Sequence, residues 1–320
     1  MDISNPQNKV ALIAGPTASG KTALALHLAK SGNFIIINAD SAQVYSDLPI
    51  LSAQPTAEEQ RSVPHHLFGY LDGVTPCSAA RWAADARGVI AHAHATGKTP
   101  ILVGGSGLYI RTLLDGIAPI PEVTLELRTE IRAMPVEQAY AALQHYDAPV
   151  AASLAPTDIS RITRALEVVQ STGRSISEWR KSKTGGIGDS ITLRPLLLLP
   201  PRDWLYKRCD NRFEMMMERG AVAEVEALLL RNLPQDAPVM RAIGVPEISA
   251  YLNGTLHRDE AIARGQIATR QYAKRQFTWF RNQAPIAWPR IELEINDSNS
   301  DNFETIFQSM YLTSHFLITS

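Results

Sequence analysis

The sequence predicts an α/β fold: a P-loop NTPase-like core with a parallel sheet, interrupted by a helical insertion. The first observation is the motif GPTASGKT at residues 15–22, which matches the phosphate-binding pattern G-x-x-x-x-G-K-[ST] in full. It follows a short apolar run, residues 10–14, and precedes an alanine- and leucine-rich segment, as the motif requires. Further apolar runs alternate with helical segments, which is the arrangement of βαβ units in a parallel sheet.

The predicted strands are four short apolar runs: residues 10–14, 34–38, 99–103 and 193–199. The helix after the motif is expected to run to about Lys30. Gly15, Asp40 and Gly104 each stand at the end of a predicted strand. Because ligands of open α/β sheets bind at the carboxyl ends of the strands, we expect these residues to border the functional site.

A long helical stretch separates the third and fourth predicted strands. Its expected helices are residues 125–132, 136–145 and 158–171, and a linker rich in Gly and Lys at 181–189 leads back to the sheet. We therefore divide the chain into an α/β catalytic core, residues 1–119 and 190–290, and a helical insertion, residues 120–189. Residues 204–281 are again mostly helical, and the polar tail at 291–320 has no pattern that indicates a role.

The overall composition is that of a globular protein, with 45% apolar residues, 20% charged residues and a net charge of −1. This excludes a mostly disordered chain, and the charge as a whole does not indicate a nucleic-acid binder. We see no signal-peptide pattern and no apolar run long enough to span a bilayer, so we expect a cytoplasmic protein without a membrane partner. The cysteines and the histidine pairs at 65–66 and 92/94 lack partners at metal-ligand spacing.

The motif at 15–22 predicts a diphosphate site. Its residues are Gly15, Pro16, Thr17, Ala18, Ser19, Gly20, Lys21 and Thr22. In such loops the backbone N–H groups surround phosphate oxygens at the positive end of the following helix, the lysine reaches the terminal phosphates, and the Thr22 hydroxyl is a ligand for Mg²⁺. ATPases usually carry an acid at the end of a later strand, whereas residues 101–103 lead into Gly104-Gly105-Ser106. ATP hydrolysis is therefore disfavoured, and a diphosphate without a nucleotide is equally compatible.

Asp40 is a candidate for acid–base chemistry. It ends the second predicted strand, within NADSAQVY at residues 38–45. A carboxylate there could accept a proton or a hydrogen bond from an incoming nucleophile. The sequence leaves a second interpretation equally open, in which Asp40 caps the N-terminus of a following helix.

The last helical stretch carries a basic segment with interleaved aromatic residues. No acidic residue occurs between Glu260 and Glu292, and four aromatic residues lie among the cations of residues 264–281. Cations can contact phosphates and rings can stack on bases, so an RNA surface is one interpretation. From these residues alone, an amphipathic helix with buried rings and solvated cations is favoured over it.

Six motifs taken together resemble the tRNA dimethylallyltransferases, also called tRNA isopentenyltransferases. They are GPTASGKT at 15–22, NADSAQVY at 38–45, PHHL at 64–67, PILVGGSGLY at 100–109, RALEV at 164–168 and TRQYAKRQFTWFR at 269–281. The resemblance implies transfer of a dimethylallyl group from dimethylallyl diphosphate to N6 of adenosine 37 in tRNA. It also implies that the loop at 15–22 holds the donor diphosphate and that Mg²⁺ is the cofactor. The anticodon stem-loop is expected to be bound, and the helical insertion at 120–189 is expected to contact the tRNA. Members are commonly described as ATP-binding because of this loop, and we expect a monomer that does not consume ATP.

The resemblance also implies roles for individual residues. Asp40, Lys21 and Ser106 are the expected catalytic residues, with Ser106 where the family usually has threonine. Arg208 and Arg212 are candidates for a diphosphate clamp, with ordinary surface salt bridges as the alternative. The expected tRNA contacts are Asp40, Ser41, Ala42, Gln43, Ser106, Arg128, Ser160, Arg161, Ile162, Thr163, Arg164, Arg241, Ala242, Ile243, Gly244, Val245, Pro246, Lys274, Arg275, Gln276, Phe277, Thr278, Trp279, Phe280 and Arg281.

Three residues depart from the family pattern. Ser160, Val245 and Gln54 stand where the family usually has glutamine, tyrosine and lysine, respectively.

Two alternative functions remain open. A P-loop small-molecule kinase would transfer phosphate from ATP and would not need the basic aromatic segment. A non-catalytic RNA-binding protein would bind tRNA whether or not Lys21 and Asp40 were intact.

Overall fold

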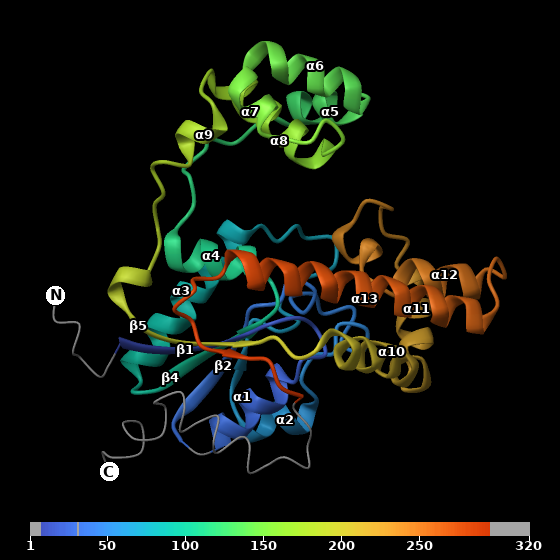
Figure 1. Ribbon diagram of the computed structural model, residues 1–320. Helices are drawn as coiled ribbons and strands as arrows, with labels where there is room; N and C mark the ends of the chain where they lie inside the picture. Colours follow the sequence, from blue (N-terminus) through green and yellow to red (C-terminus); the bar gives the residue numbers. More distant parts are fainter. Residues whose placement is uncertain (1–7, 31, 295–320) are drawn as a thin grey trace. The chain divides into compact units, whose positions relative to one another are not determined.

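The protein is described by a computed structural model over residues 8–30 and 32–294 (Figure 1). It divides into two compact units, which we call the sheet unit, residues 1–113 and 188–320, and the helical unit, residues 114–187. The tail expected at 291–320 lies, from residue 295 onward, outside the described residues. Among the described helices, none combines the length and apolar character needed to cross a membrane.

The sheet unit is built on a six-stranded parallel sheet with the order β3-β2-β4-β1-β5-β6 (Figure 1). The strands are β1 Lys9–Ala14, β2 Phe34–Asn38, β3 His65–His66, β4 Thr99–Gly104, β5 Thr192–Leu198 and β6 Arg290–Ile291. The four predicted strands are confirmed as β1, β2, β4 and β5. The edge strands β3 and β6 escape prediction because strands of two residues have no apolar pattern of their own. The predicted parallel α/β class is confirmed.

Helices connect and extend this sheet. Those between the first strands are α1 Lys21–Lys30, α2 Ala57–Ser62 and α3 Ala79–Ala95, and α4 Gly107–Asp115 follows β4. After η2 Gly188–Ser190 and β5 come α10 Arg202–Glu218, α11 Ala221–Leu230, η3 Pro238–Arg241, α12 Val245–Leu252 and α13 Arg258–Gln283. The expectation that residues 204–281 are mostly helical is confirmed. The longest helix, α13, packs along α10, where Gly265 leaves room for the ring of Phe213.

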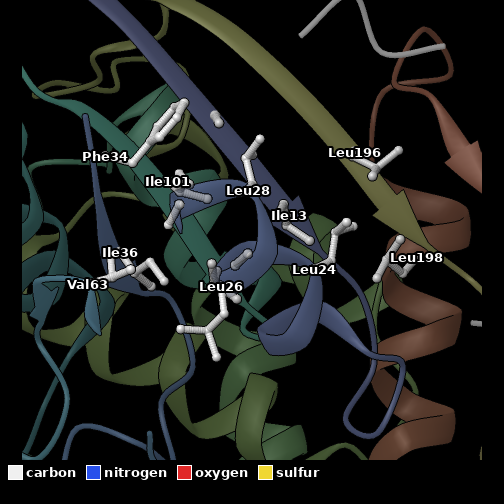
Figure 2. Packing of buried hydrophobic residues seen from close by; sticks show 14 residues of the cluster. Ile13, Leu24, Leu26, Leu28, Phe34, Ile36, Val63, Ile101, Leu196 and Leu198 are labelled. Atoms are coloured by element: carbon white, nitrogen blue, oxygen red, sulfur yellow. The ribbon is translucent and has the colours of Figure 1, made fainter. Parts of the chain in front are cut away.

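One hydrophobic core holds α1 against the sheet (Figure 2). Leu24 and Leu28 of α1 pack with Ile13 of β1, Ile101 of β4 and Leu198 of β5, and all five are buried. Each such side chain stabilises the fold by about 1.5–3 kcal/mol through loss of water contact. Because α1 begins at Lys21, this packing also holds the N-terminus of the helix at the end of β1.

The helical unit has a separate core. Its helices are α5 Leu125–Ala133, α6 Val136–Tyr146, α7 Ala148–Ala152, α8 Ile159–Thr172 and α9 Ile176–Trp179. Buried residues of α6 and α8, including Leu143 and Leu166, form its centre. The predicted helices at 125–132, 136–145 and 158–171 are confirmed as α5, α6 and α8. The short helices α7 and α9 are not predicted, because one turn is too little for a 3.6-residue period to be recognised.

We expect Leu24→Ala to lower the free energy of unfolding of the sheet unit by about 2–5 kcal/mol, through lost contacts and a cavity. The Leu24 side chain is 0% exposed. The matched control is Leu230→Ala on α11, where the side chain is 77% exposed and the expected change is within about 0.5 kcal/mol. Urea denaturation of the three proteins measures the difference, and equal losses in the two variants would contradict the assignment of Leu24 to the core.

Candidate active site

Three neighbouring strands bring the candidate residues to one edge of the sheet. β1 lies next to β4 and β4 next to β2, and their carboxyl ends lead into the loop at 15–20, into Gly104-Gly105 and into Ala39-Asp40. The ends of β2 and β4 approach closely, because the Ser106 N–H donates to the Ala39 carbonyl oxygen at 3.1 Å. A Cβ at Gly104 would lie 2.1 Å from the Ala39 carbonyl group, so this approach requires glycine.

Lys21 is a buried cation in the phosphate-binding loop. Its Nζ donates to the Pro16 carbonyl oxygen at 2.6 Å, and its side chain is largely enclosed. Burial and the nearby positive charge of Arg212 lower the pKa of Lys21 to about 8, and the negative charge of Asp40 opposes this shift. The loop therefore contains an ammonium group that loses little solvation when an anion binds to it.

Two arginines of α10 reach the same loop. The Arg208 Nε donates to the Ala18 carbonyl oxygen at 3.0 Å, and its guanidinium lies 4.7 Å from the ring centroid of Trp204. Burial lowers the pKa of Arg212, opposed by Cys209 and Asp40. Neither arginine forms a salt bridge within the described residues, so the alternative that they serve as ordinary surface salt bridges finds no partner there.

Cys209 lies between these cations in sequence and close to them in space. Its thiol is fully buried, and burial raises the pKa of Cys209 to about 11, opposed by Arg212. The thiol is therefore protonated at neutral pH and contributes no charge to the cationic side of the site.

Gln276 of α13 supports the phosphate-binding loop. Its Oε1 accepts the Thr17 N–H at 2.7 Å, and its Nε2 donates to the Gly105 carbonyl oxygen at 3.1 Å. A Cβ at Gly105 would lie 2.1 Å from this Nε2, so the contact depends on a glycine at the end of β4. The side chain is 6% exposed, and it links the phosphate-binding loop to the neighbouring strand end.

Burial corrects part of the expected RNA surface. Gln276, Phe277 and Phe280 lie on the inner face of α13 and are at most 9% exposed, so they stabilise the fold and are not presented to a partner. The same holds for a second group of interior residues, Ile162, Gly244 and Val245, whereas the largely buried Thr163 lines a cavity of the helical unit. The interpretation of this segment as an amphipathic helix is therefore right for the buried rings of Phe277 and Phe280. On the outer face, four residues are exposed: Lys274, Arg275, Thr278 and Arg281.

Asp40 is held by a turn and not at a helix end. Its N–H donates to Asn38 Oδ1 at 2.7 Å, and its Oδ1 accepts the Ala42 N–H at 3.0 Å. No helix begins here, since the next one is α2 at Ala57, and the helix-cap interpretation is therefore wrong. Because Oδ1 is occupied, the second carboxylate oxygen is available for a substrate, and no described residue donates a hydrogen bond to it.

A group of hydroxyls lies beside Asp40. Ser106 Oγ accepts the Ser41 N–H at 2.8 Å and donates to Ser41 Oγ at 3.0 Å. On α13, burial followed by the charge of Asp40 raises the pKa of Tyr272, opposed by the nearby hydroxyls of Ser41 and Ser106. The sequence does not single out Tyr272, although its four-residue spacing from Gln276 places the two on one helix face.

Several other residues of the sheet unit that we expect to contact RNA also make contacts within the protein. The Gln43 amide donates to the carbonyl oxygens of Ser52 and Ala53 at 3.0 and 2.8 Å, which holds the loop after β2. Arg241 donates to the Asp236 carbonyl oxygen at 3.0 Å. Ala42, Arg241 and Pro246 are exposed, Ala242 and Ile243 are half-buried, and Trp279 is half-buried beneath the guanidinium of Arg111.

The helical unit has its own polar cavity. It has a volume of about 420 Å³ and is lined by Arg132, Ile159, Ser160, Thr163 and Arg164. Glu167 pairs with two of these residues. Its side chain is only 1% exposed, and its carboxylate pairs with Arg132 at 2.9 Å and with Arg164 at 3.2 Å. Arg161 is exposed nearby, and Arg128 on α5 has a buried Nε without a hydrogen-bond partner in the described part of the chain.

The described residues contain no group of three or more His, Cys, Asp or Glu side chains that could form a metal site by themselves. The site described above therefore combines a cationic loop, one carboxylate and a set of hydroxyls. It can bind an anionic leaving group on one side and orient a hydrogen-bond donor on the other.

Comparisons with known proteins show which protein family this chain is similar to. A family model described as IPP transferase matches residues 43–283. The tRNA dimethylallyltransferase of Sphingopyxis alaskensis is 58% identical over 305 residues, which cover 95% of this chain and 100% of that protein. The tRNA dimethylallyltransferase of Zymomonas mobilis is 52% identical over 305 residues, with 95% and 98% covered.

Solved structures give the same result. The tRNA isopentenylpyrophosphate transferase from Bacillus halodurans is similar with a TM-score of 0.67 and 32% identity, covering 95% of this chain and 96% of that one. A eukaryotic dimethylallyltransferase acting on tRNA has a TM-score of 0.74 at 30% identity, covering 85% and 70% of the two chains. The chain therefore belongs to the tRNA dimethylallyltransferase family.

Proposed function

We propose that this enzyme transfers the dimethylallyl group of dimethylallyl diphosphate to N6 of adenosine 37 in tRNA, with the loop at 15–22 as the donor site and Asp40 as the base. The observation that carries the assignment of roles is the juxtaposition of Lys21 and Arg212 with a single free carboxylate oxygen of Asp40. β4 ends in Gly104 without an acid, which suits leaving-group stabilisation and not ATP hydrolysis.

On the donor side, positive groups stabilise the departing pyrophosphate. The C1–O bond of the allylic diphosphate breaks as negative charge develops on the pyrophosphate oxygens. Lys21, Arg208 and Arg212 supply fixed cations around the loop, and the N-terminus of α1 adds its positive end. Since the allylic carbon can bear positive charge, the main demand on the protein is to bind this leaving group and to exclude water.

A magnesium ion fits this loop. Ser19 Oγ is buried and has no hydrogen-bond partner among the described residues, and the half-buried Thr22 stands in the first turn of α1. Mg²⁺ in such sites takes most of its ligands from phosphate oxygens and water and only one or two from protein. Thr22 would hold the ion, which when bound neutralises charge on the diphosphate.

On the acceptor side, Asp40 orients the nucleophile. The N6 nitrogen forms a bond to C1 of the donor and gives one proton to the free oxygen of Asp40. The Ala42 N–H holds the carboxylate, and the Asn38 side chain holds the backbone of Asp40, in place for this transfer. The adenine must leave the anticodon-loop stack to reach a site at the strand ends.

For RNA binding we propose cationic and polar side chains of both units. In the sheet unit they are Lys274, Arg275 and Arg281 of α13. In the helical unit Arg128, Ser160, Arg161 and Arg164 are the candidates, and the cavity next to Ser160 and Arg164 suits a phosphate or an unstacked base. The proposal includes a monomeric enzyme that acts in the cytoplasm, where its tRNA is found.

Labelled dimethylallyl diphosphate and unmodified tRNA test the proposal directly. We expect label to enter tRNA with wild-type enzyme, and Asp40→Asn to lower the single-turnover rate by about 10²–10⁴-fold because it cannot accept the proton. Asp259→Asn, at an exposed position on α13, is the matched control and should be neutral. Phosphate transfer from ATP would favour the kinase alternative, and tRNA binding without transfer would favour the non-catalytic one.

The lowered pKa of Lys21 predicts a pH dependence of diphosphate binding. Lys21 is charged below its pKa of about 8 and neutral above it, so its attraction for pyrophosphate is present at low pH and lost as the pH rises through about 8. Calorimetric titration of pyrophosphate from pH 6 to pH 10 measures this. Lys21→Gln lacks the titrating group, so the ratio of the two affinities cancels the titration of pyrophosphate itself. A ratio that is constant across this range would contradict the assignment.

The exposed end of α13 predicts a salt-dependent contribution to tRNA binding. Replacing Arg281 with Ala should weaken binding and flatten the log–log salt dependence by about one unit, because one fewer phosphate is neutralised. Arg258→Ala, at the exposed opposite end of the same helix and next to Asp259, is the matched control with an unchanged slope. Parallel slopes for Arg281→Ala and wild type would show that this end of the helix is solvated in the complex.

A further inference from the structure

A single peptide group of the phosphate-binding loop is held at both of its ends. Its N–H, from Thr17, donates to Gln276 Oε1 at 2.7 Å. Its carbonyl oxygen, from Pro16, accepts a hydrogen bond from Lys21 Nζ at 2.6 Å. The same oxygen also accepts the Ser19 N–H at 3.4 Å, which fills its two acceptor sites. Because a peptide group is planar and rigid, Gln276 and Lys21 are linked through one unit of the backbone.

The loop does not keep this shape through its own backbone preference. Ala18, directly after this peptide group, has a φ of 61°, in the left-handed region that residues with a side chain rarely adopt. Such a conformation persists only where surrounding contacts fix it. Two of these contacts come from distant helices: Gln276 of α13 binds the peptide group before Ala18, and Arg208 of α10 donates to the Ala18 carbonyl oxygen at 3.0 Å.

Gln276 can serve as a support because its own amide is fixed. The side chain is almost fully buried, and its Nε2 donates to the Gly105 carbonyl oxygen at 3.1 Å. Its oxygen faces an N–H group and its nitrogen faces a carbonyl oxygen, so a rotated amide would place donor against donor and acceptor against acceptor. The amide therefore has one favourable orientation, and this orientation sets the plane of the peptide group between Pro16 and Thr17.

The position of the Lys21 ammonium group determines how strongly the loop attracts a diphosphate. Lysine carries its charge at the end of a flexible stem, so the charge is localised only where the protein holds it. Electrostatic attraction weakens with distance, and an ammonium group turned away from the anion contributes little. The hydrogen bond to the Pro16 carbonyl oxygen also favours the charged form of Lys21, whereas burial lowers its pKa.

Resting on the proposed function in one respect, that the loop at 15–22 binds the donor diphosphate, we propose that Gln276 is a positioning residue for Lys21. By accepting the Thr17 N–H, Gln276 fixes the peptide group whose carbonyl oxygen holds the Lys21 ammonium group in the loop. Without this contact the peptide group could rotate and turn that carbonyl oxygen away from Lys21. The role belongs to the donor side, although Gln276 lies in a segment that the family resemblance assigns to tRNA.

The first test is Gln276→Met, which keeps a long side chain and removes the amide. We expect pyrophosphate binding, measured by calorimetry at neutral pH, to weaken about 3- to 10-fold, the range that one hydrogen bond supports. The dissociation constant for tRNA should stay unchanged, because the side chain faces the interior. Gln235→Met, at an exposed turn position of the sheet unit, is the matched control and should bind pyrophosphate as wild type does. Pyrophosphate binding by Gln276→Met that equals or exceeds wild type would overturn the inference.

A double-mutant cycle separates the positioning of Lys21 from a general loss of loop shape. If Gln276 acts through Lys21, Gln276→Met causes little further loss of pyrophosphate affinity in a Lys21→Gln background, because the ammonium group that it positions is absent. The same fold loss in both backgrounds would overturn the inference. If Lys21→Gln alone did not weaken pyrophosphate binding, the proposed donor site would fail instead, so the two failures are distinguishable.

A second variant displaces the Gln276 amide without replacing it, so the test does not depend on whether Gln276→Met folds. Gly105→Ala would place a methyl group 2.1 Å from Gln276 Nε2, and the flexible end of that side chain must move. We expect Gly105→Ala to weaken pyrophosphate binding to a similar degree and to add nothing to the loss in Gln276→Met. Melting temperatures verify that each variant is folded. Wild-type binding by folded Gly105→Ala, or losses that add in the double variant, would contradict the role of Gln276.

Discussion

The side-chain amide of Gln276 connects the phosphate-binding loop, the end of β4 and the long helix α13, and the geometry of the site depends on this connection. One amide group uses its oxygen for the Thr17 N–H and its nitrogen for the Gly105 carbonyl oxygen, so both ends of its dipole are satisfied in the interior. Neither glutamate, which lacks the donor, nor an aliphatic side chain could replace it without leaving a buried backbone group unpaired. Since Thr17 lies in the phosphate-binding loop and Gly105 directly follows β4, α13 holds these two segments next to each other.

The charges at the strand ends are arranged in the way that prenyl transfer requires. Positive charge gathers around the loop at Lys21, Arg208 and Arg212, whereas Asp40 is the anion that influences the pKa values of Lys21 and Arg212. Burial makes these interactions stronger than they would be in water, because fewer solvent dipoles compete with them. In the proposed reaction, a leaving group that becomes more negative and an amine that becomes more positive would be stabilised on opposite sides of the reacting carbon.

Burial also organises the polar cavity of the helical unit. Glu167 is almost fully enclosed, and it forms ion pairs with the guanidinium groups of Arg132 and Arg164. A buried carboxylate is costly unless its partners are well placed, so the pairing restricts where Arg132 and Arg164 can point. Their remaining N–H groups line a cavity with Ser160, which suits recognition of RNA by shape and phosphate contacts.

Local patterns in the sequence were sufficient for much of this protein. The apolar runs gave four of the six strands, since buried parallel strands need a continuous apolar stretch. The spacing of the phosphate-binding motif predicted the loop that we propose as the donor site, because phosphate binding needs small residues, a lysine and a helix start in a row. Motif order identified the family, and helical periodicity located the three longest helices of the helical unit.

Tertiary packing alone decided which face of α13 is buried. Cations and rings alternate along this helix, and a weakly amphipathic sequence does not specify which side meets the core. Packing placed Gln276, Phe277 and Phe280 inside and left Lys274, Arg275 and Arg281 outside. It also turned Asp40 into the anchor of a tight turn and joined Gln276 to Gly105 and Thr17, which are 171 and 259 positions away in sequence. Such long-range hydrogen bonds have no local signal, because each depends on how separate elements meet at the edge of the sheet.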